Sequence, residues 1–298
     1  MKYSFVESGF CEVGPIYGAA ECSALMKEIR LRRNFDDLFL DESEYRANPR
    51  HVGVNPRPGR NLLDKLENAF IFDNPIFQER MTKALGDRWQ ILDCKLVMGV
   101  PDSWMPDWLL KETKGLAVAN LGPYVRPKHR DITYFHGIDF HQDIIDFKDR
   151  PADFVTAYVY LENTDENTSP LYVVPGSHKF GATVFPHKLE EAGGKLRYSS
   201  EDGRRCGAFE KLMLTGPQGT LYFWHALTLH GTKPHQATEP RISVRMLVEK
   251  GRRCPLECEL DRLNEAVDGP LQLSSTRKDL NASGVAQVRG NVINEIKR

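Results

Sequence analysis

The sequence predicts a mixed α and β fold, in which a helical N-terminal third precedes a sandwich or barrel of short strands. Up to about residue 88, apolar residues recur at helical spacing. From residue 89 onward, short segments rich in aromatic and β-branched residues follow one another without the helices of βα repeats. We therefore expect a single domain over 1–298, with a mainly helical layer at 1–88, a strand-rich core at 89–250 and a C-terminal extension at 251–298.

Three segments of the N-terminal third are candidate helices. In residues 19–31 the apolar side chains lie on one helical face, which is typical of an amphipathic helix: Cys22, Leu25, Met26 and Ile29. Asn61–Phe72 and Pro75–Leu85 are the second and third candidates. Residues 48–60 contain three prolines and two glycines, so they predict a loop.

Short strands are predicted where β-branched and aromatic residues gather, namely at Trp89–Met98, Phe154–Leu161, Gly219–Trp224 and Arg241–Val248. In the last of these, Ile242, Val244, Met246 and Val248 alternate with Arg241, Ser243, Arg245 and Leu247. Both faces of that strand therefore have a role. The polar stretch after about residue 269 predicts a loosely held segment.

Composition narrows the class of partner. The net charge is -1, from 40 basic and 41 acidic residues, so no strong field favours a nucleic acid or an anionic membrane. No run approaches the roughly 18 apolar residues of a membrane helix, and residues 1–8 lack the apolar stretch of a secretory signal. We expect a cytoplasmic protein that acts on a small molecule; its oligomeric state stays open.

The segment Phe140–Phe147, FHQDIIDF, places a histidine and two acids among residues that favour burial. On an extended chain, His141 and Asp143 project to the same side and form two potential metal ligands. His225 and His230 are the candidates for a third ligand, and their odd spacing on a strand lets only one of them face the metal. Two imidazoles and a carboxylate leave three positions of an octahedral ion open, as in non-haem Fe(II) oxygenases.

Arg241 follows His230 by eleven residues and opens a predicted strand. A guanidinium donates two parallel hydrogen bonds to a carboxylate, and Ser243 on the same face adds another donor. This spacing, with Gly231 and Thr232 after His230, favours His230 over His225. Arg245, also on that face, binds an anionic substrate group or forms a structural ion pair; the sequence leaves both open.

These motifs, taken in order, resemble a known family. His141-Gln142-Asp143, the segment LYVVPGSH at 171–178, His230-Gly231-Thr232 and Arg241 are similar to the phytanoyl-CoA dioxygenase family of Fe(II)- and 2-oxoglutarate-dependent oxygenases, over roughly residues 90–250. The resemblance implies a double-stranded β-helix, the jelly roll of cupin-like proteins, with the iron near one open end.

The same resemblance implies the cofactors and the roles of the motif residues. Fe(II) would be bound by His141, Asp143 and His230, and the distal carboxylate of 2-oxoglutarate by Arg241 and Thr232. Molecular oxygen would then oxidise or hydroxylate a small-molecule metabolite, with release of succinate and CO2. Since related halogenases lack the carboxylate ligand, Asp143 favours an oxidation without halide.

Further residues are expected around this site with less specific signals. Ser243 and Asn120 are candidate contacts of 2-oxoglutarate. The candidate substrate contacts are Gln142, Tyr134, Arg245 and Trp224; Gln142 points away from the metal by alternation unless the strand ends there.

Two other hypotheses fit part of the pattern. A jelly-roll protein without turnover could keep the site to bind a metal or a regulatory ligand. A zinc hydrolase could use the same ligands, but no polar general base lies near His230 in the sequence, and a hydrolase has no need of Arg241.

Overall fold

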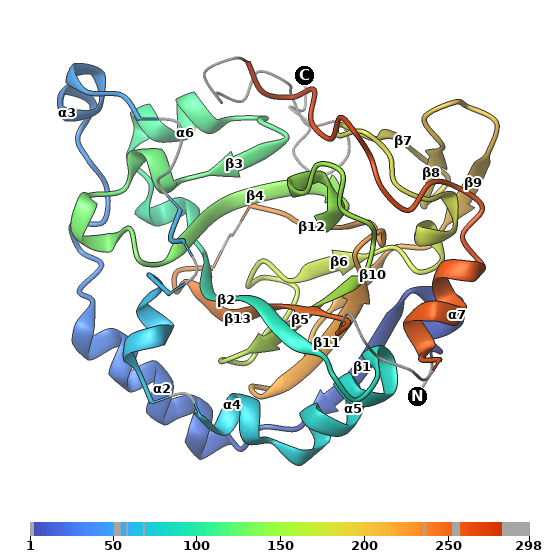
Figure 1. The fold of residues 1–298 in the computed structure, drawn as a ribbon. Coiled ribbons are helices and arrows are strands. Elements are labelled where there is room, and N and C mark those ends of the chain that lie inside the picture. The colour runs from blue at the N-terminus through green and yellow to red at the C-terminus, as the bar shows by residue number, and fades with distance from the viewer. Residues whose placement is uncertain are drawn as a thin grey trace.

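A strongly curled β-sheet forms the centre of the molecule (Figure 1). The computed structural model describes residues 3–50, 55–57, 59–67, 69–234, 237–251 and 257–281. Along the sheet, the strands of this described part of the chain follow the order β1-β11-β5-β13-β2-β4-β12-β6-β10, and β3 pairs with β4. Their bounds are β1 Phe10–Pro15, β2 Gln90–Gly99, β3 Val118–Asn120, β4 Thr133–His141, β5 Phe154–Tyr160, β6 Leu171–Val173, β10 Leu212–Leu214, β11 Thr220–His225, β12 His230–Thr232 and β13 Arg241–Glu249.

The sheet folds over on itself and so has two layers. The strands β1, β11, β5, β13 and β2 form the floor in Figure 1, and β4, β12, β6 and β10 form the roof. The short parallel pairing of β2 with β4 joins the two layers, whereas the other pairings along the sheet are antiparallel. This curled sheet flanked by helices is the jelly roll that the sequence led us to expect. The floor begins with β1, so the N-terminal layer also supplies a strand.

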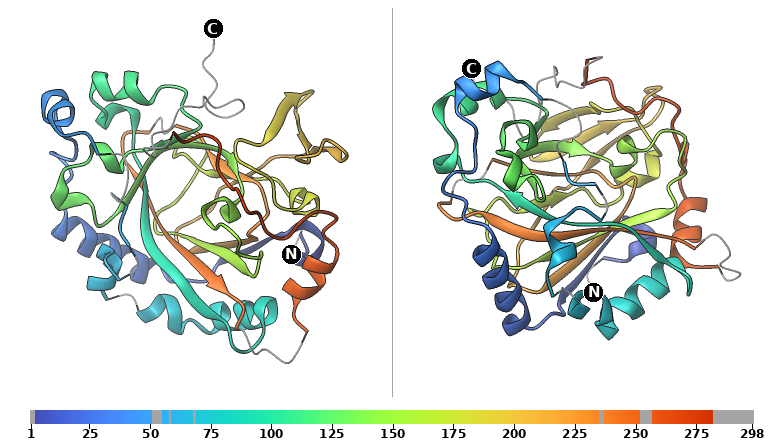
Figure 2. Two further views of the ribbon diagram at one scale, coloured as in Figure 1. Left: turned by 45° about the horizontal axis from the view of Figure 1, so that its top comes forward. Right: turned by 60° about the vertical axis from the view of Figure 1, so that its left-hand side comes forward.

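Helices cover the outer side of the floor (Figures 1 and 2). The α-helices are α1 Phe5–Ser8, α2 Ala19–Arg32, α3 Glu42–Ala47, α4 Ala69–Asp73, α5 Pro75–Leu85, α6 Asp107–Thr113 and α7 Glu259–Glu265. Short 3-10 turns lie between them, at η1 Leu62–Lys65, η2 Asp102–Trp104, η3 Gly122–Tyr124, η4 Pro127–His129, η5 Asp143–Asp146 and η6 Ser177–Phe180.

Two of the three predicted helices form as expected. In α2 the four apolar residues of the predicted face are all buried. Helix α5 has the predicted bounds, because Asn74 accepts hydrogen bonds from the backbone N–H groups of Ile76 and Phe77 and Pro75 occupies the first helical position.

The prediction of one helix over Asn61–Phe72 was wrong, since this segment divides into η1 and α4. The side chain of Asn61 accepts hydrogen bonds from Leu63 N–H and from Leu96 N–H on β2. Leu66 is extended, with φ -112° and ψ 160°. Asn61 thus ties the start of η1 to β2, and the helical pattern ends at the extended residue Leu66. Of the predicted loop at 48–60, residues 51–54 and 58 lie outside the described residues.

The two faces of β13 serve different purposes, as its alternation predicted. Ile242, Val244, Met246 and Val248 belong to the large apolar core that includes the buried residues of α2 and α5. The opposite face turns Arg241, Ser243 and Arg245 toward the interior of the jelly roll. A second cluster of side chains, largely aromatic, fills part of that interior: Phe10, Tyr158, Tyr160, Leu171, Val173, Leu214, Tyr222 and Trp224.

The C-terminal segment 268–280 is bound along the outside of the jelly roll, so the expectation of a loosely held segment was wrong for these residues. Backbone hydrogen bonds connect it to the core at Asp268–Lys179, Pro270–Ala182, Leu271–Ala152, Leu273–Asp149, Thr276–Phe185 and Lys278–Phe185. Gly269 allows its close approach, because a Cβ atom there would lie 2.1 Å from the carbonyl oxygen of Phe180.

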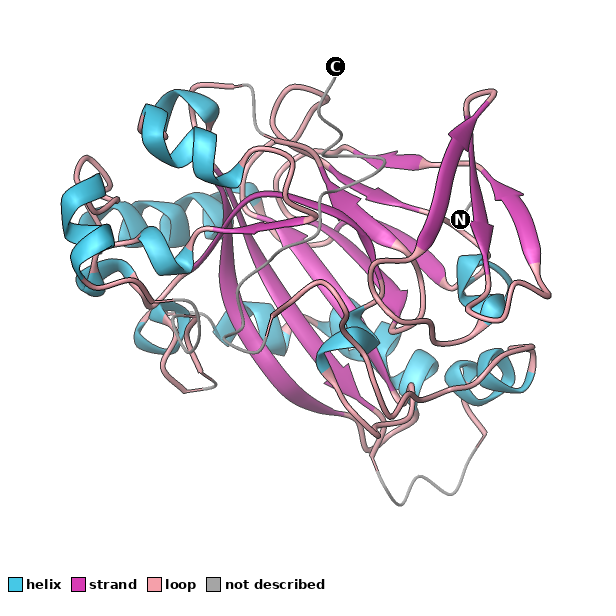
Figure 3. Cartoon of the chain, turned by 90° about the horizontal axis from the view of Figure 1, so that it is seen from above, coloured by secondary structure: helices cyan, strands magenta, loops and turns pink. Residues whose placement is uncertain are grey.

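A small antiparallel sheet projects from the edge of the molecule (Figure 3). Its strands are β7 Lys188–Ala192, β8 Lys195–Ser199 and β9 Cys206–Phe209. Within the residues described, no helix is long and apolar enough to cross a membrane.

Candidate metal and co-substrate site

Three potential metal ligands converge between the two layers of the jelly roll. His230 on β12 is the direct cross-strand partner of His141 on β4, and the ring centroids lie 4.2 Å apart. The chain stays extended through Gln142, with φ -106° and ψ 138°, so Asp143 projects to the same side as His141. One ligand atom from each of His141, Asp143 and His230 lies within 4.8 Å of the other two.

Backbone carbonyl groups fix the orientation of both imidazoles. Nδ1–H of His141 donates to the carbonyl oxygen of Asp139, and Nδ1–H of His230 donates to that of Thr228, each at 3.0 Å. Nε2 of each ring is therefore the unprotonated nitrogen that turns toward Asp143. This arrangement is the one that proteins use to present histidine to a metal ion, and the donor set fits a divalent cation.

Electrostatics also keep the three groups in the protonation states that a metal requires. Burial, with the neighbouring charge of His230, lowers the pKa of His141 to about 4, and burial lowers the pKa of His230. Burial would raise the pKa of Asp143, but the charge of Arg245, together with the hydrogen bond from Thr156, holds it well below its usual range. The site therefore offers two neutral imidazoles and one carboxylate.

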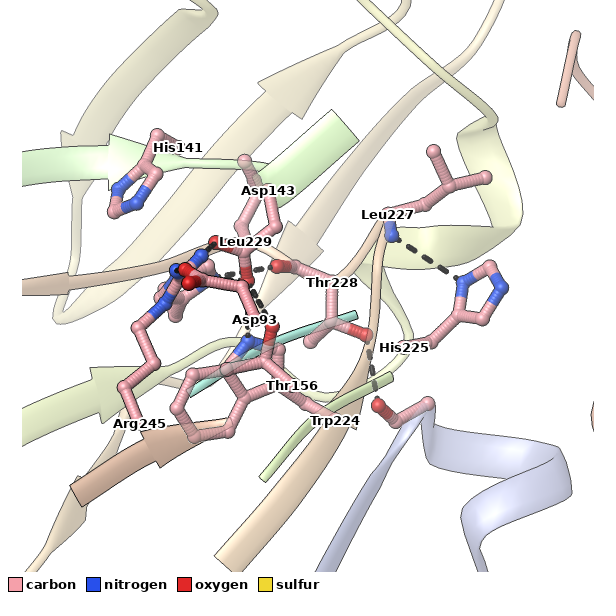
Figure 4. Close-up of polar contacts among 12 residues, drawn as sticks. Asp93, His141, Asp143, Thr156, Trp224, His225, Leu227, Thr228, Leu229 and Arg245 are labelled. Atoms are coloured by element: carbon pink, nitrogen blue, oxygen red, sulfur yellow. Dashed lines mark hydrogen bonds and ion pairs between the residues drawn. The ribbon is translucent and has the colours of Figure 1, made fainter. Parts of the chain in front are cut away.

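The carboxylate of Asp143 is held by three donors from the floor (Figure 4). Oδ2 accepts hydrogen bonds from Thr156 Oγ1 at 2.6 Å and from Trp224 Nε1 at 3.1 Å. Oδ1 accepts a hydrogen bond from the guanidinium of Arg245. Oδ2 also lies 3.4 Å from Nε2 of His230, so the carboxylate is fixed beside the imidazole.

Arg245 forms the structural ion pair that the sequence left open as one of its two roles. Besides Asp143 it faces Asp93, whose carboxylate lies 3.9 Å from its Nη1. Arg245 also lines the cavity, so its other role, as a contact of an anionic substrate group, stays a prediction. Trp224, another predicted substrate contact, lines the cavity but directs its indole N–H at Asp143.

A cavity of about 170 Å³ opens beside the three ligands. Arg241, Thr232 and Asn120, three of the residues predicted to contact 2-oxoglutarate, line it. Arg241 is only 4% exposed, and its Nε and Nη1 have no hydrogen-bond partner among the described residues. The guanidinium lies 5.7 Å and 5.9 Å from the ring centroids of Tyr158 and Tyr160. A buried cation with open donors is costly, so this pocket is suited to an anion.

The remaining predicted contacts of 2-oxoglutarate differ in how free their polar groups are. The hydroxyl of Ser243 is fully buried and, within the described part of the chain, has no partner. Thr232 Oγ1 lies 2.8 Å from the hydroxyl of Ser169. The side chain of Asn120 accepts a hydrogen bond from Gly122 N–H.

Two predicted substrate contacts lie away from the cavity. Gln142 points away from His141, and its amide bonds the carbonyl oxygens of Gly181 and Leu227 and the N–H of Thr183. The side chain of Gln142 thus points away from the candidate metal site, as the alternation along the strand predicted. Its amide is bound to these backbone groups and lies outside the cavity that a substrate would occupy. Tyr134 is fully buried in the large outer core.

His225, the rival of His230, is directed elsewhere, as Figure 4 shows. Its Nδ1 accepts a hydrogen bond from Leu227 N–H, and its Nε2 lies 3.4 Å from the carbonyl oxygen of Ala152. The structure brings His230, and not His225, to His141 and Asp143.

Several polar residues of the site escaped the sequence reasoning. Thr156 lies on the inward face of β5, and Asp93 and Lys95 lie on the inward face of β2. Polar side chains that alternate with apolar ones along a strand could have predicted these three residues. Arg277 also lines the cavity, but it comes from the C-terminal segment, far along the chain. No local pattern marks it.

Comparison with known proteins identifies the family. The family model described as Phytanoyl-CoA dioxygenase (PhyH) matches residues 5–243, which is most of the chain. The chain belongs to the phytanoyl-CoA dioxygenase family. Membership confirms the resemblance of the sequence motifs, and it extends that resemblance to the N-terminal helices and β1.

Curated relatives match parts of this phytanoyl-CoA dioxygenase family chain. A probable alpha-ketoglutarate-dependent hypophosphite dioxygenase of Stutzerimonas stutzeri is 32% identical over 103 residues, which is 34% of this chain and 35% of the relative. An L-proline trans-4-hydroxylase of Streptomyces griseoviridis is 28% identical over 127 residues, 39% of this chain and 44% of the relative. The matched stretch thus spans less than half of either relative.

Solved structures share the fold at low sequence identity. The epimerase SnoN, in complex with Fe3+, alpha ketoglutarate and nogalamycin RO, superposes with a TM-score of 0.50 and 15% identity, covering 83% of this chain and 80% of SnoN. EvdO2 from Micromonospora carbonacea var. aurantiaca, complexed with 2-oxoglutarate, gives a TM-score of 0.50 and 14% identity, covering 83% and 88%. These likenesses support the jelly-roll architecture.

Proposed function

We propose that the protein is a non-haem Fe(II)- and 2-oxoglutarate-dependent dioxygenase that hydroxylates or otherwise oxidises a small-molecule metabolite. The observation that carries the proposal is the convergence of His141, Asp143 and His230 at a cavity that Arg241 also lines, with its Nε and Nη1 donors free among the described residues. Family membership and the two relatives, a probable alpha-ketoglutarate-dependent dioxygenase and a hydroxylase, support it.

In this proposal His141, Asp143 and His230 would hold Fe(II). The bound iron supplies the activation of dioxygen, coupled to conversion of 2-oxoglutarate to succinate and CO2. Carbonyl oxygens of the backbone keep Nε2 of both histidines aimed at the metal, and Arg245, Thr156 and Trp224 keep the carboxylate of Asp143 in place.

Arg241 orients 2-oxoglutarate in the same proposal. Its charge and its free Nε and Nη1 donors bind the distal carboxylate, and Ser243, two residues on along the same face of β13, adds a hydroxyl donor. The rings of Tyr158 and Tyr160 hold the guanidinium and exclude water from it. A protein that merely binds a metal has no use for this costly buried cation, so the arrangement favours turnover over the non-catalytic alternative.

The function is tested by measuring succinate formed from 2-oxoglutarate in the presence of Fe(II) and oxygen. We expect slow formation without added substrate, abolished in Asp143→Ala and in His141→Ala. Lys148→Met, at an exposed position close by in the sequence, is the matched control and should behave as wild type. Succinate formation that persists in both ligand variants would contradict the proposal.

A further inference from the structure

Lys95 is a buried cation that neither the ligand set nor the proposed co-substrate site accounts for. It lies on β2, where Cys94, Leu96 and Met98 face the outer core and Asp93, Lys95 and Val97 face inward. Its side chain is 19% exposed and lines the same cavity as His141 and Asp143. A lysine in the middle of a central strand is costly to bury, and this cost calls for a ligand or a partner.

The immediate partners of Lys95 do not neutralise it. Its direct cross-strand neighbour is Arg245, and like charges in this position repel. The carboxylate of Asp93 lies 3.4 Å from Lys95 Nζ and 3.9 Å from Arg245 Nη1, so two cations share it. Arg245 is also engaged by Asp143, which the proposed iron would share. Lys95 therefore shares its nearest carboxylate with a second cation.

The ammonium group of Lys95 also has donors to spare. Among the described residues, Asp93 is the one carboxylate within 4.0 Å of its Nζ, at a distance longer than that of a good hydrogen bond. Burial, together with the charge of Arg245, lowers the pKa of Lys95. An anion placed against Nζ would accept hydrogen bonds from the unused donors and would raise the pKa of Lys95 again.

Arg277, the other cation near the open side of the cavity, is already occupied. Its Nε and Nη2 donate to the two oxygens of Asp279, and its Nη1 lies 3.4 Å from Asp146. Arg277 belongs to the bound C-terminal segment and forms part of the cavity wall, and Asp279 and Asp146 balance its charge. Lys95 is left as the cation with open donors on this side.

Lys95 is also separated from the candidate anchor of 2-oxoglutarate. The cross-strand partner of Arg241 on β2 is Gly99, whereas the partner of Arg245 is Lys95. Arg241 and Lys95 therefore lie at cross-strand positions four residues apart. Four residues of a strand correspond to about 13 Å between the backbone positions. One 2-oxoglutarate, bound at Arg241 and at the metal, leaves Lys95 for a second anionic group.

We propose that Lys95 anchors the anionic group, a carboxylate or a phosphorus oxyanion, of a small substrate beside the iron. The proposal rests on the oxygenase function proposed above and names the substrate class of that site. The cavity of about 170 Å³ also receives 2-oxoglutarate in the proposed function, so we expect a small substrate. Ile138 and Ile145 line the same cavity and provide an apolar surface for its carbon skeleton.

The test uses full-length protein loaded with Fe(II) and 2-oxoglutarate without oxygen, and follows the visible charge-transfer band of the chelate. The probes are small acids, each paired with an amide or ester of the same shape that lacks the anionic group: L-proline with L-prolinamide for the carboxylate arm, and hypophosphite with its ester for the phosphorus arm. We expect an acid from one arm to shift the band and accelerate succinate formation once oxygen is admitted, and its amide or ester to do neither.

Variants then assign the effect to Lys95. In Lys95→Met the affinity for the active acid should fall at least about 10-fold, as expected for a lost charged hydrogen bond, while the affinity for 2-oxoglutarate stays the same. Lys95→Arg should retain part of the affinity, and Lys148→Met all of it. These two variants separate a lost contact from a damaged fold.

Several results would overturn the proposal. They are equal effects of the acids and their amides or esters, no effect of any acid on a band that forms normally, unchanged acid affinity in Lys95→Met, or a loss of 2-oxoglutarate affinity in that variant. Failure of the wild-type band to form at all would instead contradict the oxygenase site, so the two proposals fail in different ways.

Discussion

The guanidinium of Arg245 on the floor of the jelly roll donates to Oδ1 of Asp143, a candidate metal ligand beneath the roof. Because Thr156 and Trp224 hold the other oxygen, the carboxylate cannot turn without breaking a buried hydrogen bond. Arg245 is therefore a positioning residue for the metal site, and the first prediction concerns it.

Arg245→Met should lower the affinity for Fe(II) about 10- to 100-fold, the usual effect of removing a partner of a metal ligand. Arg245→Lys keeps the charge without the fork and should have an intermediate affinity. Anaerobic titration calorimetry with Fe(II) measures both, and Arg197→Met, a substitution in an exposed ion pair, is the control. Wild-type affinity in Arg245→Met would show that Arg245 serves only the fold.

Replacing Arg241 should separate co-substrate binding from stability. Loss of two charge-assisted hydrogen bonds should weaken 2-oxoglutarate binding by about 100-fold in Arg241→Met, while Fe(II) affinity stays the same. Since Arg241 is buried with unpartnered donors, the free energy of unfolding of the metal-free variant should rise.

Chemical denaturation and 2-oxoglutarate titration of the same Arg241→Met preparation check both effects. Reduced stability combined with normal 2-oxoglutarate binding would identify Arg241 as a structural residue instead.

His230 and His225 should respond differently to substitution by alanine. His230→Ala should lose Fe(II) binding, because one of the three ligands is removed. His225→Ala should keep Fe(II) binding but lose roughly 1–3 kcal/mol of stability, since the buried N–H of Leu227 loses its acceptor. Metal analysis after dialysis, together with urea denaturation, distinguishes the two. Loss of iron from a stable His225→Ala protein would reverse the ligand assignment.

Stability should fall on mild acidification because of histidines outside the metal site. Burial lowers the pKa of His178 to about 3 and that of His225 to about 4, and no described residue hydrogen-bonds the side chain of His178. In the unfolded chain both titrate near about 6.5, so below this pH the unfolded state binds more protons. The contribution of the two neutral histidines to the free energy of unfolding is fully present above about pH 6.5. Below this pH it falls toward pH 4, by about 1.4 kcal/mol per pH unit for each group.

Urea denaturation at pH 7.5, 6.0 and 5.0 measures this slope, and His178→Met should make it shallower. An unchanged slope in His178→Met would mean that His178 is not the neutral buried group inferred here.

Much of the fold and of the candidate site was predictable because the signals are local or ordered along the chain. The alternation in Arg241–Val248 predicted that both faces of this strand have a role, and the structure places the apolar face in the large core. The spacing of His141 and Asp143 predicted that they project to one side, and the residues after His230 favoured it over His225. Each of these depends on backbone geometry that neighbouring residues determine.

The failures have tertiary causes. The segment predicted as one helix over Asn61–Phe72 divides into η1 and α4, and the side chain of Asn61 at its start binds β2. Gln142 was assigned to the substrate, but its amide links loops that come from distant parts of the sequence. The polar C-terminal segment gave no sign that its backbone would bind the core and place Arg277 at the cavity. Contacts across such sequence separations leave no local pattern.

The anaerobic spectrum of the protein with Fe(II) and 2-oxoglutarate tests the central claim most directly. We predict a weak visible charge-transfer band in the wild-type protein, absent in His141→Ala and restored in Arg241→Met only at much higher 2-oxoglutarate concentration. A wild-type protein that is folded and binds iron but shows no band would contradict the claim that His141, Asp143, His230 and Arg241 form an iron and 2-oxoglutarate site.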